Sequence, residues 1–220
     1  MNYCTLSMAI INGMRDTIQW YDENATEYAT AGKDLTFHTG IEKFTSYLLP
    51  GSKVLDAGCG AGRDSQVLHA MGLHVTGVDL SEGLLKEARK RCPDVNFVLG
   101  DLLDLPFENE SFDGVWAHAS LVHLETIQQA QKVLLEFHRV LKSNGVVYMM
   151  VKQQMGSDKT AVVSDTLSNH DRFFQYYNKE ELVALVEKAQ LTTLFIVDDV
   201  DDRAGRSDTK WIWLIARKTT

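Results

Sequence analysis

The sequence predicts an α/β fold: a mostly parallel sheet of seven strands, with helices on both faces and a helical cap at the N-terminus. Short apolar runs alternate with amphipathic segments from residue 53 onward, a pattern typical of parallel strands joined by helices. Three glycines, Gly58, Gly60 and Gly62, follow the first apolar run. Two more apolar runs, 191–197 and 210–216, predict two further strands.

Composition narrows the class of protein. The chain has 220 residues, of which 45% are hydrophobic and 24% charged; this suits one domain over residues 1–220, made of a cap (1–50) and a core (51–220). The net charge is −8, and no long lysine or arginine block occurs. A nucleic-acid partner is therefore not expected, because phosphate contacts need clustered cations. The pattern allows either a monomer or a homodimer.

Cysteine usage and the apolar runs indicate the compartment. The three cysteines are few and odd in number, which suits a reducing environment. No Cys/His cluster has the spacing of metal ligands, so no metal site is expected. The N-terminus lacks the features of a signal peptide, and no apolar run could span a bilayer. We therefore expect a cytoplasmic protein that has no membrane partner.

Two helices are expected before the first strand. Residues 15–30 have helical periodicity, which includes Tyr21 and Tyr28, and a second helix is expected over 36–49, ending before Pro50. Because both helices precede the glycine turn, they lie outside the repeating strand–helix units. We expect these two helices to form a cap over the ligand-binding cleft of the core. The alternative is that Tyr21 and Tyr28 are only core contacts.

The remaining elements follow in alternation. The expected strands are 53–57, 74–79, 95–99, 112–117 and 145–151, followed by the two C-terminal ones. The expected helices are 64–72, 82–91, 126–142 and 179–189. Asn178, three residues before Glu181, is a candidate N-cap for the last helix. Residues 153–171 are polar and are expected to form a long functional or mobile loop.

Polar residues at the ends of the first three strands predict a nucleotide cleft. Asp56 precedes the glycine turn, which lets a ligand approach the backbone at the start of the next helix. Asp79 ends the second strand roughly 20 residues later, where a carboxylate can accept both ribose hydroxyls. Asp101 follows the third strand and could accept the adenine amino group, or could instead cap a turn.

At this point the sequence resembles the class I S-adenosylmethionine-dependent methyltransferases. The resemblance covers about residues 50–152 and is carried by Val54-Leu55-Asp56-Ala57-Gly58-Cys59-Gly60-Ala61-Gly62, Gly77-Val78-Asp79-Leu80-Ser81, Gly100-Asp101-Leu102, Leu105-Pro106-Phe107, Ser111-Phe112-Asp113-Gly114-Val115 and Val140-Leu141-Lys142-Ser143-Asn144-Gly145-Val146-Val147. It implies a seven-stranded Rossmann-like sheet in which the last two strands, 191–197 and 210–216, form an antiparallel edge hairpin. It also implies methyl transfer from S-adenosyl-L-methionine, with S-adenosyl-L-homocysteine as the product.

The resemblance also implies a set of cofactor-binding residues. Asp56 would orient the methionine end of the cofactor, Arg63 could pair with its carboxylate or be merely exposed, and Leu80 would pack on the adenine. Cys59 suits a small packing residue in the glycine turn better than a nucleophile. The whole set is Tyr21, Tyr28, Asp56, Gly58, Cys59, Gly60, Gly62, Arg63, Asp79, Leu80, Asp101, Leu102 and Ala117.

Two histidines after the fourth strand, His118 and His123, are the candidate bases. Methyl transfer from a sulfonium needs a deprotonated nucleophile in line with the methyl group, and an imidazole can take its proton. The alternatives are that His118 contacts the cofactor through its backbone and that His123 caps a helix. No Asn/Asp-Pro-Pro-Tyr motif of DNA-adenine or amide methylation is present.

Two further stretches are candidates for substrate contacts. Residues 172–177 place aromatics around Arg172 and include Tyr176; they could line a substrate pocket or only anchor the loop. Residues 203–211 form a local basic stretch around Arg206 that ends in a tryptophan, which could bind an anionic group or be a solvated hairpin tip.

The leading hypothesis is methyl transfer to O, N or S of a small-molecule metabolite. The core is also similar to tRNA wobble-uridine methyltransferases, but Leu121-Val122-His123 replaces their paired histidines and broad basic character is absent. A third hypothesis is a non-catalytic scaffold that binds S-adenosylmethionine. The absence of G-x-G-x-x-G argues against a fourth, an NAD-linked dehydrogenase.

Overall fold

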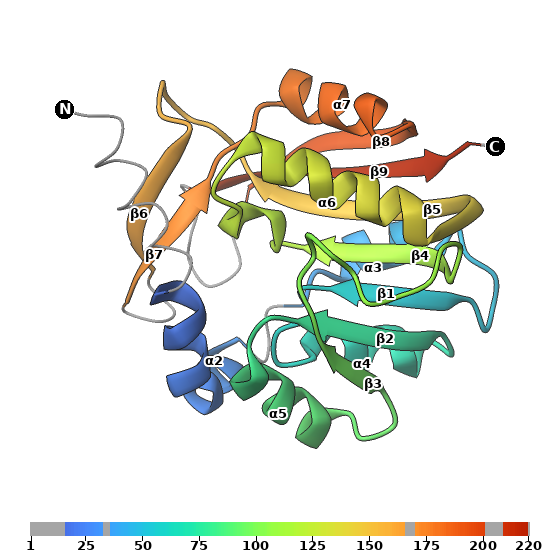
Figure 1. Cartoon of the computed structure of the whole chain (residues 1–220), viewed down its shortest axis with the longest axis horizontal. Helices are drawn as coiled ribbons and strands as arrows, with labels where there is room; N and C mark the ends of the chain where they lie inside the picture. Colours follow the sequence, from blue (N-terminus) through green and yellow to red (C-terminus); the bar gives the residue numbers. More distant parts are fainter. Residues whose placement is uncertain (1–15, 33–35, 166–169, 201–208, 220) are drawn as a thin grey trace.

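A twisted seven-stranded sheet forms the centre of the computed structural model, which describes residues 16–32, 36–165, 170–200 and 209–219 (Figure 1). Its strands lie in the order β3-β2-β1-β4-β5-β9-β8. Strands β1 to β5 are parallel, whereas β9 is antiparallel to both β5 and β8. This Rossmann-like order confirms the predicted fold class. The bounds are β1 Lys53–Ala57, β2 His74–Asp79, β3 Asn96–Leu99, β4 Phe112–His118, β5 Leu141–Lys152, β8 Leu191–Val200 and β9 Lys210–Lys218.

Helices cover both faces of the sheet, with α6 and α7 in front of the strands in Figure 1 and α3 and α4 behind them. Their bounds are α2 Ala25–Ala31, α3 His38–Thr45, α4 Arg63–Ala70, α5 Glu82–Arg91, α6 Ile127–Val140 and α7 Lys179–Lys188, with a short 3-10 helix, η1, at Leu121–His123. Asn178 accepts a hydrogen bond from the Glu181 backbone N–H, which confirms the predicted N-cap. No helix in the described ranges combines the length and apolarity that a membrane crossing needs.

The central strands read as continuous apolar runs because both of their faces are buried. Trp116 of β4 and Tyr148 of β5 have no exposed side-chain surface, and their rings stack with centroids 3.8 Å apart. Phe44 of α3 packs on Trp116 at 5.4 Å from the rear face. This packing fixes the carboxyl end of β4, where the predicted histidines begin.

The expected loop over 153–171 is only partly right, because residues 160–165 and 170–171 belong to a second sheet. Strands β6 (Thr160–Asp165) and β7 (His170–Gln175) pair antiparallel, with Ala161 opposite Phe174. Strand β7 packs against η1, and the Tyr177 hydroxyl just beyond it donates to the Leu121 carbonyl at 2.9 Å. The β-branched and aromatic pairs in this stretch, at 162–163 and 173–174, favoured strands over the polar loop that Gly156 and its neighbours suggested.

The first expected helix, over 15–30, is two helices in the structure. Residues 16–23 are helical, α2 follows, and Asn24 interrupts them with φ −118° and ψ 20°. The Asn24 side chain donates to the Trp20 carbonyl, so a polar side chain ends the first helix locally. The second expected helix is also shorter than predicted, since α3 ends at Thr45.

Gly62 is a position where a side chain should be costly. Its φ is +73°, and an added Cβ would lie 3.0 Å from the Ala88 Cβ of α5 and 3.1 Å from the Phe97 ring. Gly72 has a similar φ of +85° but open space around it. The two glycines therefore separate backbone strain from crowding.

We expect Gly62→Ala to lower the free energy of unfolding by about 2–4 kcal/mol, since it adds crowding to an unfavourable φ. Gly72→Ala should cost about 1 kcal/mol, from its φ alone. Urea denaturation of both variants measures the difference. Equal losses would show that α4 and α5 are not tightly packed at Gly62.

Candidate active-site cleft

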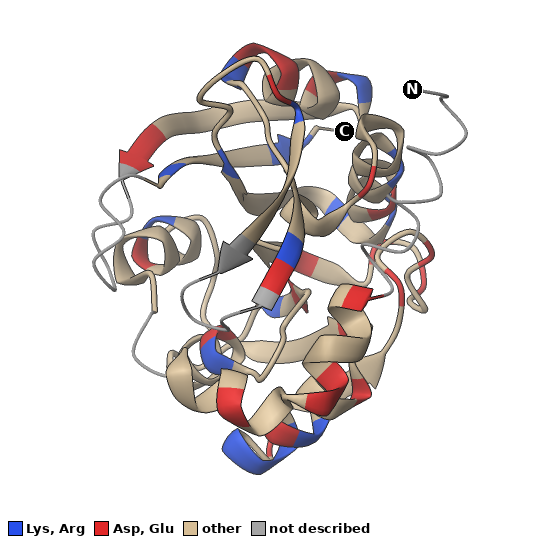
Figure 2. Ribbon diagram, turned by 90° about the vertical axis from the view of Figure 1, so that its left-hand side faces the viewer, with Lys and Arg blue, Asp and Glu red and all other residues tan. Residues whose placement is uncertain are grey.

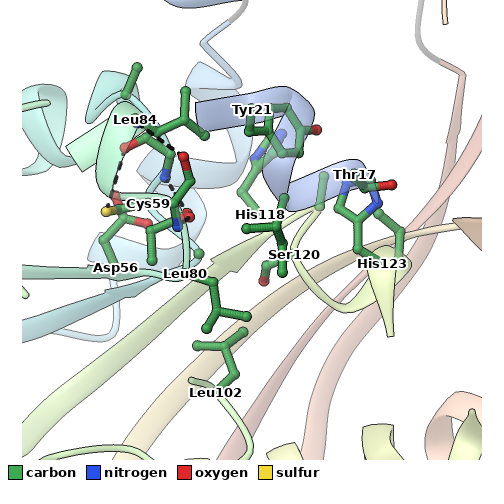
Figure 3. Close-up of a pocket in the computed structure, with 18 of the residues that line it drawn as sticks. Thr17, Tyr21, Asp56, Cys59, Leu80, Leu84, Leu102, His118, Ser120 and His123 are labelled. Carbon is green, nitrogen blue, oxygen red and sulfur yellow. Dashed lines mark hydrogen bonds between the residues drawn. The ribbon is translucent and has the colours of Figure 1, made fainter. Parts of the chain in front are cut away.

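A cavity of about 270 Å³ lies along the carboxyl ends of the central parallel strands. This edge is where open α/β sheets bind their ligands. Figure 3 shows Asp56 and Cys59 at one end, His123 and Thr17 at the other, and His118 and Ser120 between them. The predicted residues that line the cavity are Tyr21, Tyr28, Asp56, Gly58, Cys59, Gly60, Arg63, Asp79, Leu80, Asp101, Leu102, His118, His123 and Arg172.

Three of the predicted residues that the structure describes are not in the wall. Gly62 packs against α5 instead, and Ala117 is fully buried in β4, whereas His118 and Ala119 after it reach the cavity. Tyr176 is half-buried, and its backbone N–H donates to the Lys159 carbonyl. Arg206 lies outside the described residues.

The glycine turn and Asp79 hold each other in place. The Asp79 carboxylate accepts the Gly60 N–H at 2.8 Å and the Ser81 N–H at 2.9 Å. Burial raises the pKa of Asp79, and these backbone amides oppose that rise. A carboxylate has about four lone-pair positions, so two remain to accept hydroxyl groups. This geometry suits the ribose role that the sequence predicted.

Asp56 is buried beneath the glycine turn, where its carboxylate accepts the Ser65 hydroxyl at 2.5 Å. Burial raises the pKa of Asp56 to about 7, and the nearby Asp64 carboxylate adds to the effect. The Ser65 hydroxyl bond acts in the opposite direction. A cation placed beside Asp56 would favour its ionised form.

Asp64 connects Arg63 to the predicted histidine, a role that the sequence analysis missed. It accepts two hydrogen bonds from Arg63, at 2.7 and 3.2 Å, and one from the Trp116 indole at 3.0 Å. The His118 Nδ1 lies 3.5 Å from the same carboxylate. Burial alone would raise the pKa of Asp64, but Arg63 and His118 hold it below its usual range. The signal for this role was an acid in the first turn of the helix after the glycines.

His123 lies in η1, and its Nδ1 is 3.0 Å from the Phe173 carbonyl oxygen of β7. Because a carbonyl only accepts, we assign the proton to Nδ1, which leaves the Nε2 lone pair available. Burial lowers the pKa of His123 to about 3, and the cations Arg172 and Lys152 contribute. His123 is therefore neutral at pH 7 and is a hydrogen-bond acceptor rather than a strong base.

Arg172 joins the N-terminal helices to the β6–β7 hairpin. Its guanidinium donates to the Tyr21 hydroxyl and lies over the Tyr21, Tyr28 and Phe174 rings at 5.6, 5.8 and 5.4 Å. Burial raises the pKa of Tyr21, so its hydroxyl stays protonated. Both tyrosines line the cavity as well as packing, so Arg172 anchors the hairpin and also belongs to the wall.

A second contact fixes the same helices on the other side. The Asp22 carboxylate accepts the Ser81 hydroxyl at 2.6 Å and the Gly83 N–H at 2.9 Å, at the start of α5. An acid at a helix N-terminus is favourably placed. Residues 16–23 are thus tied to both ends of the cavity, as expected of a cap.

Two wall residues at the far end were not predicted as a pair. Lys152 ends β5, directly opposite Trp211 of β9 in the register, and both line the cavity. The Lys152 Nζ lies 3.4 Å from the centre of the Phe174 ring. Like Asp79 and Asp101, Lys152 is a polar residue at the end of a parallel strand, and this position was the signal that could have predicted it.

Comparison with known proteins agrees with this geometry. Residues 55–149 match a family described as "Methyltransferase domain". A protein of Encephalitozoon cuniculi that is named as a methyltransferase is 31% identical over 182 residues, which cover 76% of this chain and 82% of that protein. The chain belongs to the class I S-adenosylmethionine-dependent methyltransferases.

Other members of the family differ in what their names describe. This methyltransferase is 30% identical over 158 residues to the sterol 24-C-methyltransferase ERG6B of Gibberella zeae, covering 66% of this chain but only 41% of that enzyme's length. A Burkholderia thailandensis 1,6-didemethyltoxoflavin-N1-methyltransferase, solved with 1,6-didemethyltoxoflavin and S-adenosylhomocysteine, shares the fold with a TM-score of 0.72. It is 20% identical, with coverage of 100% of this chain and 92% of that one.

The described residues fit S-adenosylmethionine and offer no metal site. Glycines line one wall, and carboxylates from three neighbouring strands converge there. No group of three or more His, Cys, Asp or Glu side chains in the described ranges could hold a metal ion. The donor set is thus suited to a nucleoside that carries a cationic tail.

The raised pKa of Asp56 predicts how the free energy of unfolding depends on pH. The pKa of Asp56 is 3.8 in the unfolded chain and about 7 in the folded chain. Between these pH values Asp56 ionises more readily in the unfolded chain, so it increasingly destabilises the fold as the pH rises. We expect Asp56→Asn to gain stability relative to the wild type by up to about 1.4 kcal/mol per pH unit between pH 5 and 7. Urea denaturation across this range measures it.

Asp113→Asn is the matched control. Its contacts with Lys142 and the Lys53 N–H lower the pKa of Asp113, although burial opposes them. The stability from Asp113 is therefore fully present above the unfolded pKa, and the difference from wild type should stay flat from pH 5 to 7. A flat difference for Asp56→Asn as well would contradict the assigned pKa.

We expect Asp79→Ala to weaken S-adenosylmethionine binding by about 1.5–3 kcal/mol, because charge-assisted hydrogen bonds to the ribose would be lost. Asp94→Ala removes the same charge from an exposed position and should leave the affinity unchanged. Calorimetric titration of both variants makes the comparison. Unaltered affinity in folded Asp79→Ala would reject the ribose role.

Proposed function

We propose that this protein transfers a methyl group from S-adenosylmethionine to an O, N or S atom of a small-molecule metabolite by in-line displacement, releasing S-adenosylhomocysteine. The observation that carries the proposal is the covered cavity. The cap helices and the β6–β7 hairpin meet over it through Arg172 and Tyr21. A cavity of about 270 Å³ beneath such a cover suits a small acceptor better than a folded macromolecule.

Surface charge supports the same acceptor class. In Figure 2, Lys and Arg are scattered among Asp and Glu on the face that the view shows. The short basic run at the end of α5 is largely paired, since Arg89 bonds Glu82 and Lys90 bonds Glu87, each at 2.7 Å. A tRNA acceptor would favour a continuous basic surface.

The residues at the strand ends have proposed tasks in binding the cofactor. S-adenosylmethionine supplies an electrophilic methyl group when it is bound. Asp79 accepts the ribose hydroxyls, Asp56 faces the methionine end, and Asp101 with the Leu102 backbone recognises the adenine. These residues lie on or just after β1, β2 and β3, so the sheet itself sets their spacing.

The histidines orient the acceptor. His118 is held beside Asp64, and His123 presents its Nε2 lone pair after donating from Nδ1 to Phe173. His118 lines the middle of the cavity, where an acceptor atom would meet the methyl group, and His123 lines the end beyond it. Correct alignment is the main requirement of a displacement of this kind. We further propose a single cytoplasmic domain over residues 1–220, which acts as a monomer or homodimer.

The test has two stages. Calorimetry should show binding of S-adenosylmethionine and S-adenosylhomocysteine but not of NADH. Incubation with S-adenosylmethionine and a metabolite extract should then give products heavier by one CH₂, detected by mass spectrometry. Failure to bind either adenosyl compound would refute the proposal, and methylation of tRNA with no metabolite product would refute the acceptor class.

A further inference from the structure

An ion pair begins the helix that follows the glycine turn. Arg63 and Asp64 are the first two residues of α4, directly after Gly62, whose φ is +73°. An acid in the first turn of a helix is favourably placed, whereas a cation there opposes the helix dipole. The preferences of a helix therefore account for Asp64 but not for Arg63.

Asp64 holds the Arg63 guanidinium by one edge. Its carboxylate accepts the Arg63 Nε–H at 2.7 Å and an Nη2–H at 3.2 Å. The Trp116 indole donates to the same carboxylate at 3.0 Å, and Trp116 itself is fully buried in the sheet. Paired hydrogen bonds of this kind fix the orientation of a guanidinium as well as its position. The core of the sheet thus sets the direction of Arg63.

The other side of that guanidinium is available to a ligand. Arg63 lines the cavity, its side chain is 25% exposed, and its Nη1 has no hydrogen-bond partner among the described residues. Burial alone would lower the pKa of Arg63, but Asp64 raises it above its ordinary value, and Tyr28 and Asp56 add to the rise. Arg63 therefore keeps its positive charge in the cavity wall.

Asp56 places a group of opposite charge near this cation. Both residues line the cavity. Burial raises the pKa of Asp56, and the charge of Arg63 opposes that rise, so the two groups interact. The methionine end of the cofactor carries an ammonium group and a carboxylate on the same carbon atom. A site for it needs an acid and a base a short distance apart, and Asp56 and Arg63 supply them.

Arg91 of α5 is another cation in the cavity wall. It donates to the Ala29 carbonyl of α2 at 3.0 Å, which ties α2 to α5. Burial lowers the pKa of Arg91, and the charge of Arg63 lowers it further. Arg91 thus has a contact that explains its position, and it is the alternative to Arg63 that an experiment must separate.

We propose that Asp64 is a positioning residue of the cofactor site, which holds Arg63 with its Nη1 toward the carboxylate of S-adenosylmethionine. The inference rests on the cofactor named in the proposed function and not on the acceptor class. Without Asp64, the Arg63 side chain should turn toward solvent, because a partly buried guanidinium that lacks a partner is costly. Asp64 therefore affects ligand binding through Arg63, and chiefly for ligands that carry the carboxylate.

Two ligands that differ only in the carboxylate test the inference. S-adenosylhomocysteine is compared with S-adenosyl-3-thiopropylamine, its decarboxylated form, by calorimetric titration. We expect the wild type to bind S-adenosylhomocysteine about tenfold or more tightly than the amine, since hydrogen bonds to charged groups are worth about that much. This preference should fall to about twofold or less in Arg63→Met and at least about threefold in Asp64→Asn. The amine should lose no more than about twofold in affinity in either variant.

Asp113→Asn is the matched control, because Asp113 pairs with Lys142 at 2.7 Å near the start of β4, at the opposite edge of the sheet from the cavity. It should keep the wild-type preference. Arg63→Lys separates orientation from charge, since a lysine keeps the charge but cannot make the paired contact with Asp64. Its preference should fall as in Asp64→Asn, and this variant still tests the proposal if Asp64→Asn does not fold.

Four results would overturn the inference. They are equal binding of the two ligands by the wild type, a full preference in Asp64→Asn or Arg63→Lys, equal weakening of both ligands in Asp64→Asn, and a preference that survives Arg63→Met but is lost in Arg91→Met. Failure of the wild type to bind either ligand would instead contradict the proposed function, and this inference with it.

Discussion

Three aspartates at the carboxyl edge of the parallel sheet constrain the rest of this structure; Asp56 and Asp64 are buried and Asp79 is half-buried. Asp56, Asp64 and Asp79 cannot all be ionised in a low-dielectric site without compensation. Asp64 is compensated by Arg63 and the Trp116 indole, and Asp79 by two backbone amides. Burial raises the pKa of Asp56 to about 7, and among the described residues only the Ser65 hydroxyl donates to its carboxylate. The folded chain thus holds one carboxyl group that a bound cation would shift toward its ionised form.

The cap and the hairpin depend on that edge as well. Residues 16–23 lie over it because Asp22 binds the start of α5 at Ser81, two residues after Asp79. From there Tyr21 reaches Arg172 on β7, while Tyr177 anchors the end of the hairpin to η1. The cover is therefore fixed by polar contacts at both ends, and its apolar residues fill the space between.

Sequence reasoning predicted the wall residues at the ends of β1, β2 and β3 more completely than those at the end of β5 and on β9. The glycine turn, Asp79 and Asp101 are local to the strand ends that position them, so spacing along the chain was sufficient. Lys152, Trp211 and Arg172 meet only through pairing of β5 with β9 and folding of the β6–β7 hairpin, which are contacts between distant segments. Asp64 was missed for a similar reason, since its role depends on Trp116 and His118, which lie more than fifty residues later.

The carboxylates of the cavity bear on cofactor binding more than on the rate of methyl transfer. The positive charge of a bound sulfonium is lost as its methyl group transfers. Walls that stabilise that charge then favour the reactants at least as much as the transition state, and such stabilisation does not raise the rate of the chemical step. The acceleration must come from alignment, which is worth several kcal/mol when two reactants are held in line. The short contacts that fix the cap, the hairpin and the glycine turn are consistent with that requirement, because they limit how far the two ends of the cavity can move apart.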